Sequence, residues 1–174
     1  MQVPQTFIHP EEKIKTMKPT EVLTYKAASL TEISDAATTI AATGTKQELL
    51  FALETVHRIN RASSTLGAEI TQLVESIGKV ADLTSAEAFE AMRHTEDNSQ
   101  EALVLARKLA EIGTQDHIEI MIPRFSIGTE GYNLLNQALK RLLETEATQE
   151  TVHTDVDALV LAFQTNTAMR DAGN

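Results

Sequence analysis

Residues 45–80 read TKQELLFALETVHRINRASSTLGAEITQLVESIGKV, and this stretch decides the fold that the sequence predicts. From Val56 to Val80, apolar residues recur at alternating steps of three and four, and only Ser63 interrupts the series. Such spacing places a narrow apolar seam along one helix, as in coiled coils and helical bundles. Gly67 costs about 1 kcal/mol relative to Ala, but the seam keeps its phase across it. We therefore expect one long helix over about 45–81.

The composition favours an all-α protein with a single core. Of the 174 residues, 42% are hydrophobic, whereas aromatic residues make up 4% and Trp is absent. Seven Gly and four Pro are few for an all-β protein, which needs frequent turn residues. No internal repeat of fixed period is evident. The prediction is a helical bundle of four to six helices around the long helix, with residues 1–18 as an extended arm and short helix and 19–174 as one bundle domain.

Several helix boundaries are marked by local signals. The capping-box pattern Thr-x-x-Glu occurs at Thr45–Glu48 and Thr84–Glu87, and each predicts a helix start. Another helix is expected from Pro19 to Gly44, since Pro suits a first turn and Gly a helix end. After Thr84 the sequence has an almost entirely polar middle. The chain there either forms one long helix to about residue 112, which we expect, or breaks at Asn98.

Towards the C-terminus, the helical period returns twice. One amphipathic helix is expected after Thr129, and a final one carries Val152, Val156, Leu159 and Phe163 on one face.

The segment 117–122 allows two interpretations. Ile118, Ile120 and Ile122 alternate with Glu119 and Met121, and a period of two predicts a short strand. Pro123 would limit that strand to an edge, where the N-terminal arm is the evident partner. The alternative is a further helical turn that Pro ends. Apolar residues of the arm and of this segment are the candidate interaction residues, namely Val3, Phe7, Ile8, Ile118, Ile120 and Ile122.

Two Glu-x-x-His pairs, Glu54–His57 and Glu150–His153, are the most suggestive chemical pattern. Bundles that hold two metal ions, iron or manganese, use such pairs on two helices, with single Glu residues from two others. The single ligands could be Glu21 and either Glu87 or Glu90. However, Glu54 and His57 flank the apolar seam instead of occupying it, so solvent-facing residues without metal are the favoured interpretation. We expect no cofactor and no catalytic residue.

Other classes of site are disfavoured by what the sequence lacks. The absence of Cys excludes disulfides and thiolate chemistry. No Gly-x-Ser-x-Gly elbow or phosphate-binding Gly-rich loop is present. A net charge of −10 opposes binding to nucleic acid or anionic lipid. With no signal peptide and no apolar run of about 20 residues, we expect a soluble protein, cytoplasmic or within an assembly such as a virion, and no membrane insertion.

The leading functional hypothesis is a non-enzymatic structural or assembly protein. It would act through helix-mediated self-association or docking with other subunits of a larger complex, such as a virion, a secretion system or a filament. Two alternatives remain: a ferritin-like di-metal enzyme or metal-binding protein, and an acidic inhibitor or adaptor whose carboxylates mimic nucleic acid.

Overall fold

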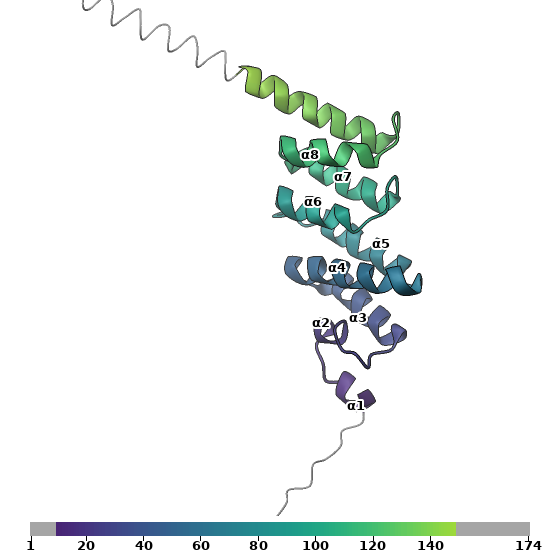
Figure 1. Cartoon of the computed structure of the whole chain (residues 1–174). Coiled ribbons are helices and arrows are strands. Elements are labelled where there is room, and N and C mark those ends of the chain that lie inside the picture. The colour runs from purple at the N-terminus through teal and green to yellow at the C-terminus, as the bar shows by residue number, and fades with distance from the viewer. Residues whose placement is uncertain (1–9, 149–174) are drawn as a thin grey trace, which may run out of the picture.

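The computed structural model describes residues 10–148, and all of its regular structure is helical (Figure 1). The all-α prediction is confirmed. The helices are α1 (Pro10–Ile14), α2 (Pro19–Val22), α3 (Leu30–Thr43), α4 (Lys46–Ser63), α5 (Gly67–Gly78), α6 (Ser85–Arg93), α7 (Gln100–Ile112), α8 (Gln115–Met121), the 3-10 turn η1 (Ile122–Arg124) and a helix over 130–148.

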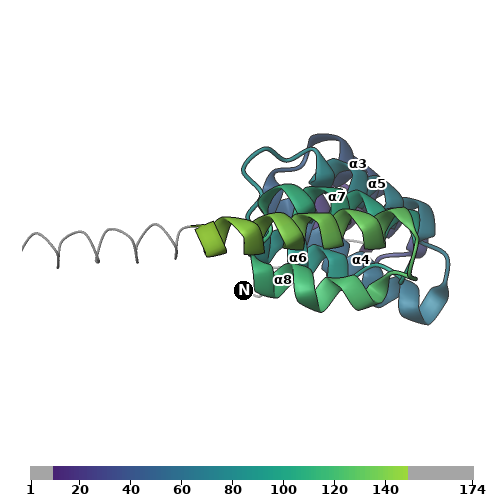
Figure 2. The same cartoon turned by 90° about the horizontal axis from the view of Figure 1, so that it is seen from above.

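The helices stack in two layers. Helices α3, α5 and α7 lie side by side in one layer, and α2, α4, α6 and α8 form the other. Helical hairpins such as α4–α5 and α6–α7 join the layers, and the helix over 130–148 lies across the end of the stack (Figures 1 and 2). This is the arrangement of α-solenoids, in which each hairpin buries its apolar face against its neighbours.

The predicted continuous helix over 45–81 is wrong, because the chain reverses between α4 and α5. Ser64 ends α4 in the left-handed region, with φ 55°, and its N–H donates to the carbonyl of Asn60. The side-chain oxygen of Asn60 in turn accepts the N–H of Leu66 at 2.7 Å. The predicted seam is nevertheless buried. Val56 on α4 and Leu73 on α5 are both fully enclosed, because the two halves of the seam face the same core.

Two other predicted helices are also divided. The helix predicted from Pro19 to Gly44 stops at Val22, and α3 starts after Ser29, whose hydroxyl and Glu32 form a capping box. The break at Asn98 is the correct alternative for the segment after Thr84. Asn98 has φ 56°, and the hydroxyl of Ser99 accepts the N–H of Ala102 at the start of α7. The helices are therefore shorter and more numerous than predicted.

The strand predicted near 117–122 is wrong, and its helical alternative is correct. This segment belongs to α8 and η1, where Ile118 and Met121, three residues apart, are both buried on one helix face. Ile120 lies on the opposite face and is 60% exposed, and Ile122 packs against the core. Of the candidate interaction residues within this segment, Ile120 is thus the accessible one.

A Gly-Thr pair turns the chain from one layer to the other at two places. Gly44 follows α3 with φ −70° and ψ 152°, and Gly113 follows α7 with φ −69° and ψ 149°. The N–H of each donates to the carbonyl four residues earlier at 2.7 Å. A Cβ at either glycine would collide with that same carbonyl, so a side chain is not tolerated there. Thr45 and Thr114 then begin α4 and α8.

Residues 1–9 and 149–174 lie outside the described residues. The interaction candidates Val3, Phe7 and Ile8 and the candidate ligands Glu150 and His153 therefore remain predictions. Within residues 10–148, no helix is long and apolar enough to cross a membrane.

Candidate functional site: the groove between α4 and α6

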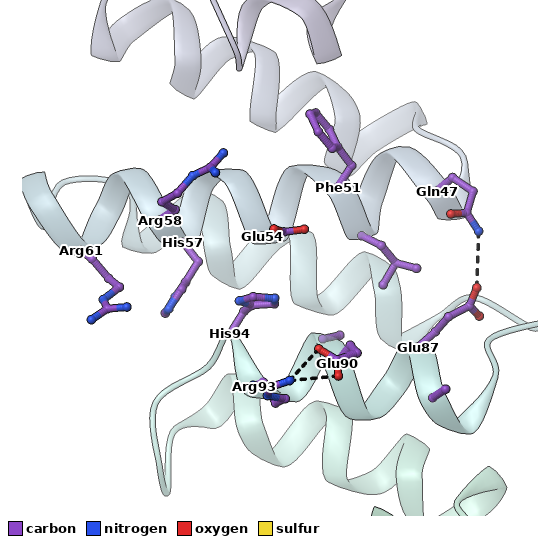
Figure 3. Close-up of a pocket in the computed structure, with 13 residues that line it drawn as sticks. Gln47, Phe51, Glu54, His57, Arg58, Arg61, Glu87, Glu90, Arg93 and His94 are labelled. Carbon is purple, nitrogen blue, oxygen red and sulfur yellow. Dashed lines mark hydrogen bonds and ion pairs between the residues drawn. The ribbon is translucent and has the colours of Figure 1, made fainter.

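A groove of about 850 Å³ lies between α4 and α6, which run in the same direction in one layer (Figure 3). Interactions between the two helices close it at both ends. At their N-terminal ends, the Lys46 ammonium lies 3.2 Å from carboxylate oxygens of both Asp82 and Glu87. At their C-terminal ends, the rings of His57 and His94 lie 5.4 Å apart, centre to centre. The contacts at the two ends hold the helices together and leave the middle open.

Small side chains on α6 create the open middle. Ala86 and Ala91 line the groove from α6, opposite Leu50 and Phe51 of α4. The two alanines are too short to fill the space between the helices. Phe51 extends from α4 on the side away from α6 (Figure 3) and is 40% exposed, although it adjoins fully buried Ala52 and Leu53. The groove therefore has an apolar centre that water reaches.

Unpaired positive charge gathers at the histidine end. Arg58 and Arg61 are exposed and line the groove, and neither makes an ion pair within residues 10–148. Arg93 also lies there, but its guanidinium pairs with Glu90 at 3.1 Å. Figure 3 shows His57 and Arg61 extending from α4 on the side of His94, whereas Arg58 extends from the opposite side of the helix. This end can accept an anionic group without first breaking a contact.

The opposite end of the groove is acidic. Glu87 accepts a hydrogen bond from the Gln47 side chain at 3.4 Å, in addition to its ion pair with Lys46. The backbone N–H of Thr84 and then the Lys46 ammonium lower the pKa of Glu87, against a smaller opposing effect of burial. Glu87 is therefore ionised at neutral pH. The groove has two unpaired arginines at one end, Leu50 and Phe51 together with the exposed Glu54 in its middle, and Glu87 at the other end.

Both groove histidines are held in their neutral form at neutral pH. Burial is the largest cause that lowers the pKa of His57, and the nearby His94 and Arg61 add to it. Burial also lowers the pKa of His94, against the opposing charges of Glu54 and Glu90. Because neutral imidazoles do not repel each other, the two rings can lie in contact.

The described residues do not bring a di-metal ligand set together. Glu54 and His57 flank the buried seam, as predicted, and line the groove, with Glu54 exposed and His57 half-buried. The additional candidate ligands are engaged elsewhere: Glu21 accepts the N–H of Lys18 at its own helix start, Glu87 pairs with Lys46, and Glu90 pairs with Arg93. Among residues 10–148, no group of three or more His, Asp or Glu side chains could hold a metal ion.

A nucleic-acid mimic needs a row of unpaired carboxylates, for which the candidates are Glu87, Glu90, Glu96, Asp97 and Glu101. Most of these carboxylates have partners within the chain. Asp97 pairs with Arg124 at 2.6 Å, and Glu101 accepts the hydroxyl hydrogen of Thr71. Since Glu87 and Glu90 have their own cationic partners, these carboxylates do not form an unpaired row. The arrangement thus gives the mimicry hypothesis no support.

One serine–histidine contact lies outside the groove. The Ser85 hydroxyl lies 2.7 Å from Nδ1 of His117 and accepts the N–H of Thr114 at 3.1 Å. The His117 ring stacks on Phe89, with ring centres 4.7 Å apart. In the part of the chain that the structure describes, no carboxylate is hydrogen-bonded to His117, so nothing orients the ring as in a catalytic triad. The contact joins the start of α6 to α8.

His94 is one of the groove residues that the sequence did not reveal, like Phe51, Arg58 and Arg61. It follows α6 and meets His57 only because α4 and α6 are neighbours in one layer. The fold therefore defines a stacked helical scaffold with one open, bipolar groove as its candidate site. Comparison of the chain with protein-family models, curated proteins and solved structures finds no match.

Proposed function

We propose that this protein is a non-enzymatic assembly protein, whose helical stack docks a helical segment of another subunit or another copy in the α4–α6 groove. The observation that carries the proposal is the groove itself, an open apolar centre at Phe51 beside the unpaired Arg58 and Arg61. Helical stacks commonly bind partners along their extended surfaces, and an amphipathic helix is the usual ligand of an apolar groove.

The energetics of Phe51 support a docking role. Complete burial of a fully exposed Phe side chain is worth about 1.5–3 kcal/mol, so covering the 40% of Phe51 that is exposed would contribute about 0.6–1.2 kcal/mol. Surrounding charges are typical of the polar rim of a protein interface, where an apolar centre supplies affinity and charges set orientation. A docked helix would cover Phe51 and neutralise the two arginines together.

Two further exposed apolar side chains lie in α8 and in the turn that follows η1. Ile120 is 60% exposed and Ile127 85% exposed, close to where the helix over 130–148 begins. Solenoids need polar capping surfaces at their ends to stay soluble as single units. Apolar side chains here are consistent with assembly through more than one face.

The proposal is tested with the mass of the full chain in solution and the substitution Phe51→Asp. We expect the wild-type protein to form concentration-dependent oligomers or to retain a co-purifying subunit, and Phe51→Asp to abolish that association. Leu30→Asp is the matched control, because Leu30 is 44% exposed but lies outside the groove. A chain that stays monomeric and binds no subunit, or one in which both variants behave alike, would contradict the proposal.

A further inference from the structure

The α4–α6 groove matches one segment of the chain itself. We propose that it binds residues 150–170 of a second copy, and that two copies exchange these segments to form a closed dimer. This inference rests on the proposed docking function and names the ligand of the groove. The order of charges, the length of the segment and the direction in which the chain leaves the stack all favour this dimer.

The order of charges along the segment complements that along the groove. In the sequence, Glu150, Asp155 and Asp157 precede the apolar run 158–163, and Arg170 follows it. In the groove, Arg61 and Arg58 come first, Glu54 and then the apolar Phe51 and Leu50 follow, and Glu87 lies at the far end. With its acids beside the arginines and its arginine beside Glu87, a helix that lies antiparallel to α4 would lay its apolar run along the middle of the groove.

The apolar period of the segment suits a helix that lies in a groove. Val152, Val156, Leu159 and Phe163 follow steps of four, three and four, which is one face of an α-helix. Phe163 is the one Phe, Tyr or Trp between residues 149 and 174. A bulky side chain is therefore available for the space that Ala86 and Ala91 leave open.

The lengths also agree. From Gln47 to Arg61 the groove follows fourteen residue steps of α4, about 21 Å at 1.5 Å per residue. From Asp155 to Arg170 the segment has fifteen steps, about 22 Å as a helix. The charges at both ends can thus be matched at the same time.

The direction of the preceding helix favours a second copy over the same chain. The helix over 130–148 extends beyond the edge of the stack, as seen from above in Figure 2. The residues from Leu143 to Thr148 are all exposed. The chain therefore leaves residue 148 while pointing away from its own groove. Mutual exchange of identical segments closes a two-fold dimer and leaves no groove empty.

Charge reversal on each side of the proposed contact provides the test. One full-length variant carries Arg58→Glu and Arg61→Glu, and another carries Asp155→Arg and Asp157→Arg. We expect the wild-type chain to be a dimer and each variant to dissociate at least about tenfold more readily, because like charges then face each other. A variant with Lys15→Glu and Lys26→Glu has the same charge change as the groove variant at exposed positions outside the groove, and should stay dimeric.

Mixing the two variants gives the decisive measurement. In the mixed dimer, one groove–segment contact is the wild-type pair and the other is the fully reversed pair, so both contacts are complementary. Sedimentation of the equimolar mixture should therefore recover the wild-type dimer, while each variant alone remains monomeric. Circular dichroism of each variant verifies that its helices are intact.

The results separate this inference from the proposed function. If Asp155→Arg with Asp157→Arg leaves association unchanged while Phe51→Asp abolishes it, the groove binds something else and the inference is overturned, but the docking function stands. A mixture that stays monomeric overturns exchange between copies. A wild-type chain that is monomeric and binds a separate subunit through the groove also overturns it.

Discussion

Replacement of Arg124 by alanine should destabilise the protein far more than removal of its ion-pair partner. The guanidinium of Arg124 pairs with Asp97 and also donates hydrogen bonds to the carbonyls of Met92 and Thr95. These carbonyls lie at the C-terminal end of α6, where backbone acceptors lack partners within the helix. Arg124 thus fixes the end of α6, next to the groove histidine His94.

The magnitude follows from which groups lose their partner. The Asp97 carboxylate is 64% exposed, so its ion pair is worth only about 0.2–1 kcal/mol. The Met92 carbonyl keeps a 2.7 Å hydrogen bond from the Thr95 hydroxyl when Arg124 is removed. The Thr95 carbonyl loses its charged donor, and a hydrogen bond to a charged group contributes about 1.5–3 kcal/mol. We expect Arg124→Ala to lower the free energy of unfolding by about 2–3 kcal/mol.

Urea unfolding, followed by circular dichroism at the helical band, measures this difference. Three variants are compared with the wild type: Asp97→Asn, Arg124→Lys and Arg124→Ala. Asp97→Asn should shift the midpoint least and Arg124→Ala most, with Arg124→Lys between them, because lysine keeps the charge but not the planar fork. An unchanged slope with denaturant is needed for the comparison. If Arg124→Ala were no worse than Asp97→Asn, the hydrogen bonds to the carbonyls would not contribute as argued.

Helix starts could be predicted from the sequence because their signals are local. At Thr45, the backbone N–H donates to the Glu48 carboxylate at 2.8 Å, and the Thr45 hydroxyl accepts the N–H of Glu48. The box at Thr84 forms in the same way. Such contacts span three residues, so a short sequence pattern contains all of their partners.

Helix ends were harder to predict, because α4 ends without the usual glycine. Its C-cap Ser64 adopts a left-handed φ, which glycine adopts most readily, and so does Asn98 in the connection between α6 and α7. The apolar period also continues across the turn after Ser64, since α4 and α5 bury their seams in one core. Periodicity reports which residues face the core, and it contains no information about where the chain reverses.

The candidate site was only half visible in the sequence. Glu54 and His57 were identified as neighbours of the seam, but His94 comes from another hairpin and reaches His57 through the packing of α4 on α6. The repeating architecture was hidden for a related reason. The Gly-Thr corners at Gly44 and Gly113 are alike, whereas the other connections differ in length, so the hairpins do not recur at a fixed period.

Three further measurements test the corners, the caps and the histidines. Gly113→Ala should destabilise the protein, because its Cβ would lie 2.9 Å from the core residue Ile118. In Gly67→Ala the Cβ would meet nothing within 4 Å, so this variant should raise the free energy of unfolding by about 0.4–1 kcal/mol. Opposite shifts of the urea midpoint are therefore expected, and shifts of the same sign would contradict the close approach at Gly113. Thr45→Ala should cost about 1 kcal/mol in the same assay through loss of the α4 cap, and an unchanged midpoint would mean that the cap is not needed. Folding lowers the pKa of His57 and His94, so the unfolded chain binds more protons than the folded chain below the ordinary pKa of 6.5. The free energy of unfolding is therefore greatest above that pH. It falls as the pH decreases through the lowered pKa values. Measuring the urea midpoint from about pH 7.5 to about pH 5.5 should show this fall. His94→Gln should make the fall smaller, because the variant removes one of the two protonation sites and the charge that opposes protonation of the other. An equally steep fall in His94→Gln would assign the pH dependence to other groups.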